Sequence, residues 1–196
     1  MKLSFISLIF LVTSIFFLNT GFSNNSEEIY REKVFEYISK IGDFESRFIQ
    51  IQNGEVQNGG FYKGKNRMRI IYDDPTNIEF VIKKNNVMYF NKNLQEVQYF
   101  GTKNNNSKIF FDLFNNINFL DDANFNLSSN MFYFYKNIII DEELILIRVY
   151  FEESPMLIRR IDIQDGENEI SVYINNINLN PSFSENFFSL ANPLLN

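Results

Sequence analysis

Between residues 26 and 42 the apolar residues recur at the three- and four-residue spacing of an amphipathic helix. Ser26 is a good N-cap, and acidic residues follow it directly, where they suit the positive end of the helix dipole. The expected apolar face consists of Ile29, Val34, Phe35, Ile38 and Ile41. Gly42 then favours termination, so the sequence predicts a helix that lies with one face on apolar surface.

Most of the remaining chain alternates apolar and polar residues with the period of two that is typical of β-strands. In the stretch RMRIIY, Met68, Ile70 and Tyr72 fall on one side and Arg67 and Arg69 on the other, before Asp-Asp-Pro ends the strand. Similar stretches with intervening turns run over 44–50, 78–83, 87–90, 97–100, 131–136, 143–151, 156–164 and 169–179. With no linker and no repeat between them, they predict one continuous sheet whose cations face solvent.

The strand pattern is interrupted at Ser107. The following residues place Ile109, Phe110, Leu113 and Phe114 at helical spacing, with Ser107 as the cap. A second short helical piece is expected over Ile117–Ala123. The interruption therefore predicts one or two helices packed against the sheet.

The first residues have the three-part organisation of a secretory signal peptide. A lysine at position 2 is followed by an apolar run over 3–18 and by the small-x-small tripeptide GFS. An uncleaved membrane anchor is the alternative, although the run is short for a full span. We expect residues 1–23 to be a cleaved signal peptide and residues 24–196 to form a single domain outside the cytoplasm.

Charge and composition exclude several classes of function. Removing residues 1–23 leaves 17 basic and 24 acidic residues, which argues against nucleic-acid binding. With no His and no Cys, a Ser-His-Asp triad, a Cys-His pair and the usual zinc sites cannot form, and no cysteine is available for lipidation. Carboxylate pairs such as Glu152-Glu153 are adjacent on strands and point to opposite faces. We therefore expect no enzymatic activity, no metal and no cofactor.

Aromatic residues are unusually frequent, with 23 Phe and 10 Tyr in 196 residues. They could simply fill a packed core, or they could line a cavity that stays open for an apolar ligand. Composition alone leaves both interpretations open.

The order of motifs resembles the LolA family of periplasmic lipoprotein carriers. ISKIGDFESRFIQIQNGEVQNGGFYKGKNRMRIIYDDP is similar to the family's N-terminal half, which has an amphipathic helix, a strand with R-F-x-Q and a Gly-led strand before R-x-x-Y-x-x-P. The matching positions are Arg47, Phe48, Gln50, Gly60, Arg69, Tyr72 and Pro75. MYFNKNLQEVQYF and MLIRRIDIQDGENEISVYINNINLNPSFSENFFSLANP resemble the family's later hairpin and C-terminal half. The resemblance covers essentially the whole chain after residue 23.

This resemblance implies an α+β, mainly β fold: an incomplete antiparallel β-barrel covered by a lid of α-helices. It implies a periplasmic chaperone, a monomer, that shelters the acyl chains of lipoproteins on the way from the inner to the outer membrane. The expected partners are acylated lipoproteins, an inner-membrane ABC complex of the LolCDE type and an outer-membrane receptor of the LolB type. A lipid or glycolipid binding protein on the same half-barrel is the alternative function. A hydrolase that uses carboxylates is a further alternative, for which the sequence offers no positive feature.

The alternation along the strands and the spacing along the helices identify candidate residues of an acyl-chain cavity. The candidates on the sheet are Met68, Ile70, Tyr72, Phe80, Ile82, Met88 and Phe90. The candidates on the lid are Phe35, Ile38, Phe110, Leu113 and Phe114. Ordinary core packing is the competing interpretation for each of them.

One position departs from the family pattern. Where the family has an arginine that latches the lid by hydrogen bonds to lid backbone, this chain has Gly64. Lys63, Lys65 and Arg69 are the candidate replacements, although a lysine offers a point charge rather than a planar fork. The resemblance therefore predicts a lid that closes more weakly or through another donor.

Overall fold

The computed structural model describes residues 22–102, 106–128 and 131–195. In these residues it has two α-helices, α2 (Phe22–Lys40) and α3 (Ser107–Asn115), and a short 3-10 helix, η2 (Pro193–Leu195). The strands are β1 (Phe44–Gln52), β2 (Glu55–Gly64), β3 (Arg67–Tyr72), β4 (Ile78–Lys83), β5 (Asn86–Asn91), β6 (Glu96–Gly101), β7 (Asn124–Ser128), β8 (Met131–Ile140), β9 (Glu143–Glu153), β10 (Met156–Asp165) and β11 (Asn168–Leu179).

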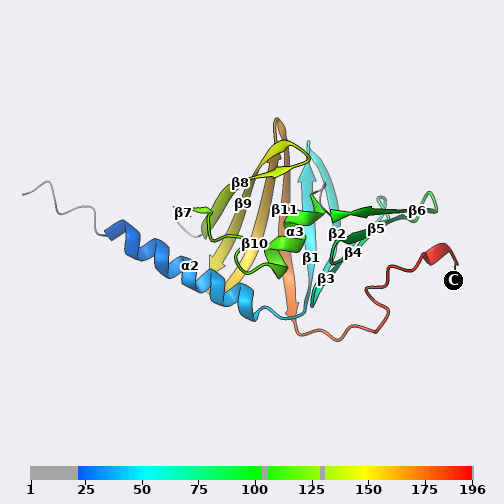
Figure 1. Cartoon of the computed structure of the whole chain (residues 1–196), viewed down its shortest axis with the longest axis horizontal. Helices are drawn as coiled ribbons and strands as arrows, with labels where there is room; N and C mark the ends of the chain where they lie inside the picture. The colour runs from blue at the N-terminus through cyan, green and yellow to red at the C-terminus, as the bar shows by residue number, and fades with distance from the viewer. Residues whose placement is uncertain (1–21, 103–105, 129–130, 196) are drawn as a thin grey trace, which may run out of the picture.

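All described strands belong to one antiparallel sheet in the order β6-β5-β4-β3-β2-β1-β11-β10-β9-β8-β7. Two meanders, β1 to β6 and β7 to β11, join where β1 pairs with β11. Among the described strands β6 and β7 are the two edges, so the sheet curves without closing (Figure 1). This confirms the predicted incomplete antiparallel β-barrel.

The two helices cover the concave face of the sheet. In Figure 1, α3 crosses in front of β11 and β1, while α2 runs along the ends of β7 to β10. Aromatic contacts fix both helices: the Tyr30 ring lies 4.5 Å from that of Phe132, and the Phe114 ring lies 5.2 Å from that of Phe44. The predicted helical lid is therefore present.

Strand alternation decides which residues enter the core. Met68 pairs with Ile82 across β3 and β4, and Ile82 pairs with Val87 across β4 and β5, so all three point to the concave side. Each of these three side chains is fully buried. Removing such surface from water supplies the main stabilisation of the sheet and of the helices on it, about 25 cal/mol per Å².

The first helix begins earlier than predicted. α2 starts at Phe22, so Ser26 lies inside the helix and the N-cap prediction is wrong. Of the predicted signal peptide, residues 1–21 lie outside the described residues, and its cleavage stays a prediction. In the part of the chain that the structure describes, no helix is long and apolar enough to cross a membrane.

The segment between α3 and β8 also differs from expectation. Ile117–Ala123 was predicted as a short helix but forms consecutive turns, with backbone bonds such as Phe119 N–H to the Asn116 carbonyl. β7, which follows, was not predicted, because its polar sequence NFNLS lacks the strand pattern. These turns place a run of carbonyl groups beside α2.

The C-terminal segment after β11 packs on the convex face. A second apolar cluster forms there from Val81, Met88 and Phe188. Arg67 and Arg69 do lie on this face, but their guanidinium groups sit 4.6 Å and 4.7 Å from the rings of Phe188 and Phe187. The prediction that these cations face open solvent is therefore wrong, because the C-terminal segment covers them.

Candidate apolar binding site

A hollow of about 270 Å³ lies on the concave face beneath the N-terminal end of α3. Its walls come from both halves of the sheet and from the helix. The lining residues are Gln50, Ile70, Tyr72, Phe80, Phe100, Asn106, Ser107, Phe110, Ile163 and Ile170. None of these described side chains carries a charge, and most are apolar. The hollow is therefore suited to a hydrocarbon chain.

A glycine shapes the sheet next to this hollow. A Cβ atom on Gly59 would lie 2.4 Å from the Phe48 ring and 2.3 Å from the Ile71 carbonyl oxygen. Without that atom, the rings of Phe48 and Tyr72 meet edge to face across β2, with centroids 5.1 Å apart. The glycine thus lets Tyr72 rest against Phe48 at the edge of the hollow.

The hollow contains one polar pair on the sheet. The Tyr72 hydroxyl donates to Gln50 Oε1 at 2.7 Å, and Gln50 Nε2 donates to Gln57 Oε1 at 3.5 Å. Burial raises the pKa of Tyr72 to about 12, so the phenol stays protonated and remains a hydrogen-bond donor at neutral pH. The apolar site therefore carries a fixed neutral polar spot.

α3 is anchored to the core along its length. Ile109, Leu113 and Phe114 are buried in the core. Asn115 accepts a hydrogen bond from the Asn66 backbone N–H at 3.2 Å, which ties the helix end to the β2–β3 turn. Phe110, nearer the helix N-terminus, is only partly buried and lines the hollow. Ser107 and Phe110 thus place the N-terminal end of α3 over the hollow as its roof.

The structure brings only part of the predicted cavity together. Ile70, Tyr72, Phe80 and Phe110 line the hollow. Others are fully packed core residues on the same face: Met68, Ile82, Leu113 and Phe114.

Met88 and Phe90 lie on the other face of the sheet. In the β4–β5 register Met88 pairs with Val81 and Phe90 pairs with Glu79, which are convex-face residues. Met88 packs with Val81 beneath the C-terminal segment. The prediction that these two residues line the cavity is therefore wrong, since the phase of this strand is opposite to the one assumed.

Two further hollows flank α2. One, of about 230 Å³, lies toward the turns after α3 and includes the predicted lid residues Phe35 and Ile38. The other, of about 470 Å³, lies toward the β9–β10 hairpin, with Met156 and Leu157 among its apolar walls. Phe35 itself is half exposed. α2 therefore rests on the sheet with open space on either side.

The three candidate latch residues lie in separate places. Lys63 points inward, and its ammonium donates to the Gly42 carbonyl oxygen at 2.8 Å; burial lowers the pKa of this side chain. It fastens the link between α2 and β1. Lys65 is exposed in the β2–β3 turn. Arg69 bonds the Phe187 carbonyl and pairs with Glu79 on the convex face, so its prediction as a lid latch is wrong.

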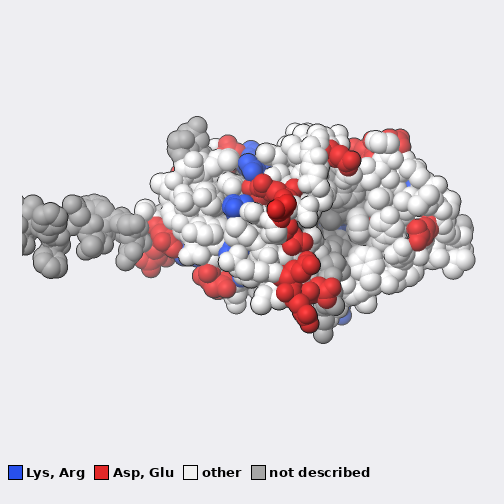
Figure 2. Space-filling model, turned by 90° about the horizontal axis from the view of Figure 1, so that it is seen from above, with Lys and Arg blue, Asp and Glu red and all other residues white. Residues whose placement is uncertain are grey.

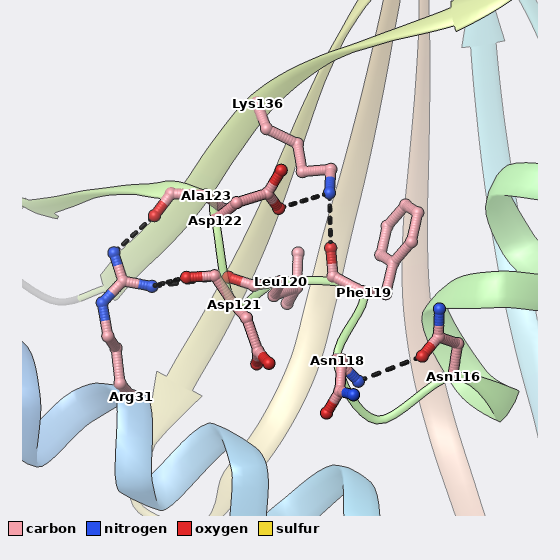
Figure 3. Close-up of polar contacts among 9 residues, drawn as sticks. All are labelled: Arg31, Asn116, Asn118, Phe119, Leu120, Asp121, Asp122, Ala123 and Lys136. Atoms are coloured by element: carbon pink, nitrogen blue, oxygen red, sulfur yellow. Dashed lines mark hydrogen bonds and ion pairs between the residues drawn. The ribbon is translucent and has the colours of Figure 1, made fainter.

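A latch to lid backbone is instead provided by Arg31 of α2 (Figure 3). Its guanidinium donates to the carbonyl oxygens of Leu120 and Asp121, at 3.4 and 3.3 Å, and to that of Ala123. Glu27 orients the group through an ion pair at 2.7 Å. The i, i+4 spacing with Glu27 was visible in the sequence, but the carbonyl partners about ninety residues away were not.

Lys136 of β8 holds the same turns from the other side. Its ammonium donates to the Phe119 carbonyl oxygen at 2.8 Å and pairs with Asp122 at 2.5 Å (Figure 3). The turns between α3 and β7 are therefore clamped between a helix and a strand.

Carboxylates gather at one end of the molecule. Figure 2, seen from above, shows a band of acidic side chains across the end of the sheet. The β8–β9 and β10–β11 hairpins turn at this end and carry exposed Asp141, Glu142, Glu167 and Glu169. Glu169 directly precedes Ile170 of the hollow, but it points to the opposite face of the sheet and pairs with Arg148.

The open curved sheet, its helical cover and the uncharged hollow define an incomplete β-barrel of the kind that encloses apolar ligands. Residues 39–191, more than half of the chain, match the family model described as outer membrane lipoprotein carrier protein LolA. The chain belongs to the LolA family. No curated protein matches it.

Several solved structures are similar to this chain at very low sequence identity. An uncharacterized conserved protein from Thermus thermophilus is 8% identical with a TM-score of 0.52, covering 79% of this chain and 90% of that one. A DUF1329 family protein from Desulfovibrio piger is 10% identical, with a TM-score of 0.48 and coverage of 83% and 97%. LprF from Mycobacterium bovis is 10% identical, with a TM-score of 0.40 and coverage of 81% and 97%. The first of these supports the fold alone.

Proposed function

We propose that this protein is a periplasmic chaperone that carries lipoproteins from the inner to the outer membrane. The observation that carries the proposal is the uncharged hollow beneath α3, in a chain of the LolA family. Lipoprotein acyl chains cannot cross an aqueous compartment unaided, because each exposed methylene costs about 0.8 kcal/mol. A sheltering hollow removes that cost.

The size of the hollow indicates how much chain it shelters at rest. At about 270 Å³ the hollow is slightly smaller than the roughly 300 to 1,000 Å³ of typical small-molecule sites. A full set of acyl chains needs more room. The hollows beside α2 are where movement of this helix would enlarge the space.

The proposal also includes the protein's partners and its role as a binding protein. We infer a monomeric binding protein rather than an enzyme, which receives cargo from a LolCDE-type complex and delivers it to a LolB-type receptor. The absence of His and Cys from the sequence supports the non-enzymatic role. A predicted cleaved signal peptide, residues 1–23, would release the carrier into the periplasm.

Depletion of the protein in its native cell tests the transport role. We expect lipoproteins to accumulate in the inner-membrane fraction after depletion, and unchanged lipoprotein distribution would contradict the proposal. Native mass spectrometry of the purified protein separates the alternative function: an acylated protein bound to it supports the carrier, whereas free lipid or glycolipid supports a lipid-binding protein.

A further inference from the structure

The polar pair inside the hollow has hydrogen-bonding capacity to spare. The Gln50 side-chain amide has two N–H donors, and its bond to Gln57 Oε1, at 3.5 Å, is long. Its carbonyl oxygen already accepts the Tyr72 hydroxyl at 2.7 Å. A ligand group that accepts one hydrogen bond at this spot would therefore complete the pair rather than disturb it.

The surroundings of the pair disfavour a negatively charged ligand group. Among the described residues that line the hollow none is a lysine or arginine. The nearest carboxylates in the sequence, Glu169 and Asp73, belong to the other face of the sheet, where Arg148 and Arg47 form ion pairs with them. An ionised carboxylate that leaves water without a cationic partner is strongly penalised.

A neutral carbonyl has the opposite properties. The carbonyl of an ester or amide accepts hydrogen bonds, carries no charge and is attached directly to the acyl chain. With the chain against Ile70, Phe80 and Phe110, its carbonyl would need a donor on the same wall. Gln50 Nε2 is the donor that the sheet provides there, and the Tyr72 hydroxyl holds the Gln50 amide in place by donating to Gln50 Oε1.

We infer that Gln50 and Tyr72 make the hollow selective for the neutral carbonyl at the head of an esterified or amidated acyl chain, and against the carboxylate of a free fatty acid. This inference rests on the proposed function, because it requires an acyl chain in the hollow. It names the ligand class: acyl esters and amides, as opposed to fatty-acid anions or plain hydrocarbon.

The test compares three competitors for a naphthylphenylamine probe bound to the purified protein. The first is a peptide with a dipalmitoyl-glyceryl cysteine, the second is its diether analogue of equal chain length, and the third is sodium palmitate below its critical micelle concentration. We expect the diester to bind roughly three- to tenfold more tightly than the diether, which is the effect of one net hydrogen bond. We expect palmitate to bind more weakly than the diester.

The variant that isolates the pair is the double substitution Tyr72→Phe with Gln50→Leu, which leaves no unpaired hydroxyl in the hollow. It should bind diester and diether equally, with the diether affinity kept. Tyr89→Phe is the matched control: the Tyr89 ring packs against Phe80 with centroids 5.3 Å apart, but Tyr89 does not line the hollow. This control should keep the preference. Thermal unfolding checks that both variants are folded.

The outcomes separate the inference from the function on which it rests. Equal binding of diester and diether by the unchanged protein would overturn the carbonyl inference and leave the carrier proposal standing. Palmitate binding as tightly as the diester would overturn the selectivity against carboxylates. If neither acylated peptide displaces the probe, the proposed function itself fails. If the double variant still prefers the diester to the diether, residues other than Gln50 and Tyr72 cause that preference, and the inference is overturned.

Discussion

Replacing Arg31 with alanine should release the turns at 116–123 from α2 without unfolding the sheet. Hydrogen bonds from charged donors contribute about 1.5 to 3 kcal/mol each. Two of the carbonyl contacts are long, at 3.4 and 3.3 Å, and the side chain is 30% exposed. We therefore expect the hydrogen bonds of Arg31 together to stabilise the closed turns as much as one well-formed hydrogen bond from a charged donor, by about 2 to 3 kcal/mol.

This magnitude converts directly into a change in local opening. A loss of about 2 to 3 kcal/mol raises the population of the open segment roughly 30- to 150-fold. Native-state hydrogen exchange, followed by mass spectrometry, measures that population in peptides covering 116–123 and α2. Exchange in β1 and β11 should stay unchanged, because the sheet does not depend on the latch.

Two further variants make the result specific. Arg31→Lys keeps the charge but loses the planar fork, so its exchange should be intermediate. Lys40→Ala is the matched control, since Lys40 makes a similar i, i+4 pair with Glu36 on an exposed part of the same helix. Such pairs contribute about 0.3 to 0.5 kcal/mol. Unchanged exchange at 116–123 in Arg31→Ala, or an equal change in Lys40→Ala, would refute the latch.

Further predictions concern packing and titration. Gly59→Ala should destabilise the fold by about 1 to 3 kcal/mol in urea unfolding, since its Cβ has no room; wild-type stability would contradict the close approach. Leu113→Ala should lower the free energy of unfolding by about 2 to 5 kcal/mol, because Leu113 is buried. Phe110→Ala should lower it less, because Phe110 borders the partly open hollow, and should enlarge the site that binds the probe. Equal losses in the two variants would argue against an open hollow. Burial raises the pKa of Tyr37 and Tyr72 to about 12, so their stabilising contribution is complete below pH about 10 and is lost as pH rises through about 12. Tyr72→Phe should therefore flatten the fall in unfolding free energy over that window, and an equally steep fall in the variant would contradict the assignment.

Local periodicity predicted most of the strands, the helix α3 and the inward residues of β3 and β4, because these elements have one apolar and one polar face. It failed for Met88 and Phe90. In β5 the residues Val87 to Phe90 are apolar on both faces, since α3 and the core cover one side and the C-terminal segment covers the other. Alternation cannot decide the phase of a strand that is buried on both sides.

The remaining site features depend on contacts between distant parts of the chain. The bond from Arg31 to the Asp121 carbonyl joins residues 90 positions apart, and the bond from Arg69 to Phe187 joins residues 118 apart. Neither acceptor is a side chain, so residue types alone contained no signal for it. The resemblance to the family indicated that a backbone latch was needed, but not which cation would provide it.

The central claim is that acyl chains occupy the hollow beneath α3. Photo-crosslinking in living cells tests it most directly, with benzoylphenylalanine placed at Phe110 and, as the control, at Leu94, which is 70% exposed in the β5–β6 turn outside the hollow. We predict that the probe at Phe110 captures lipoproteins and that it fails to capture the same proteins when their acylated cysteine is replaced. Capture that does not depend on acylation, or that is equal at Leu94, would contradict the account.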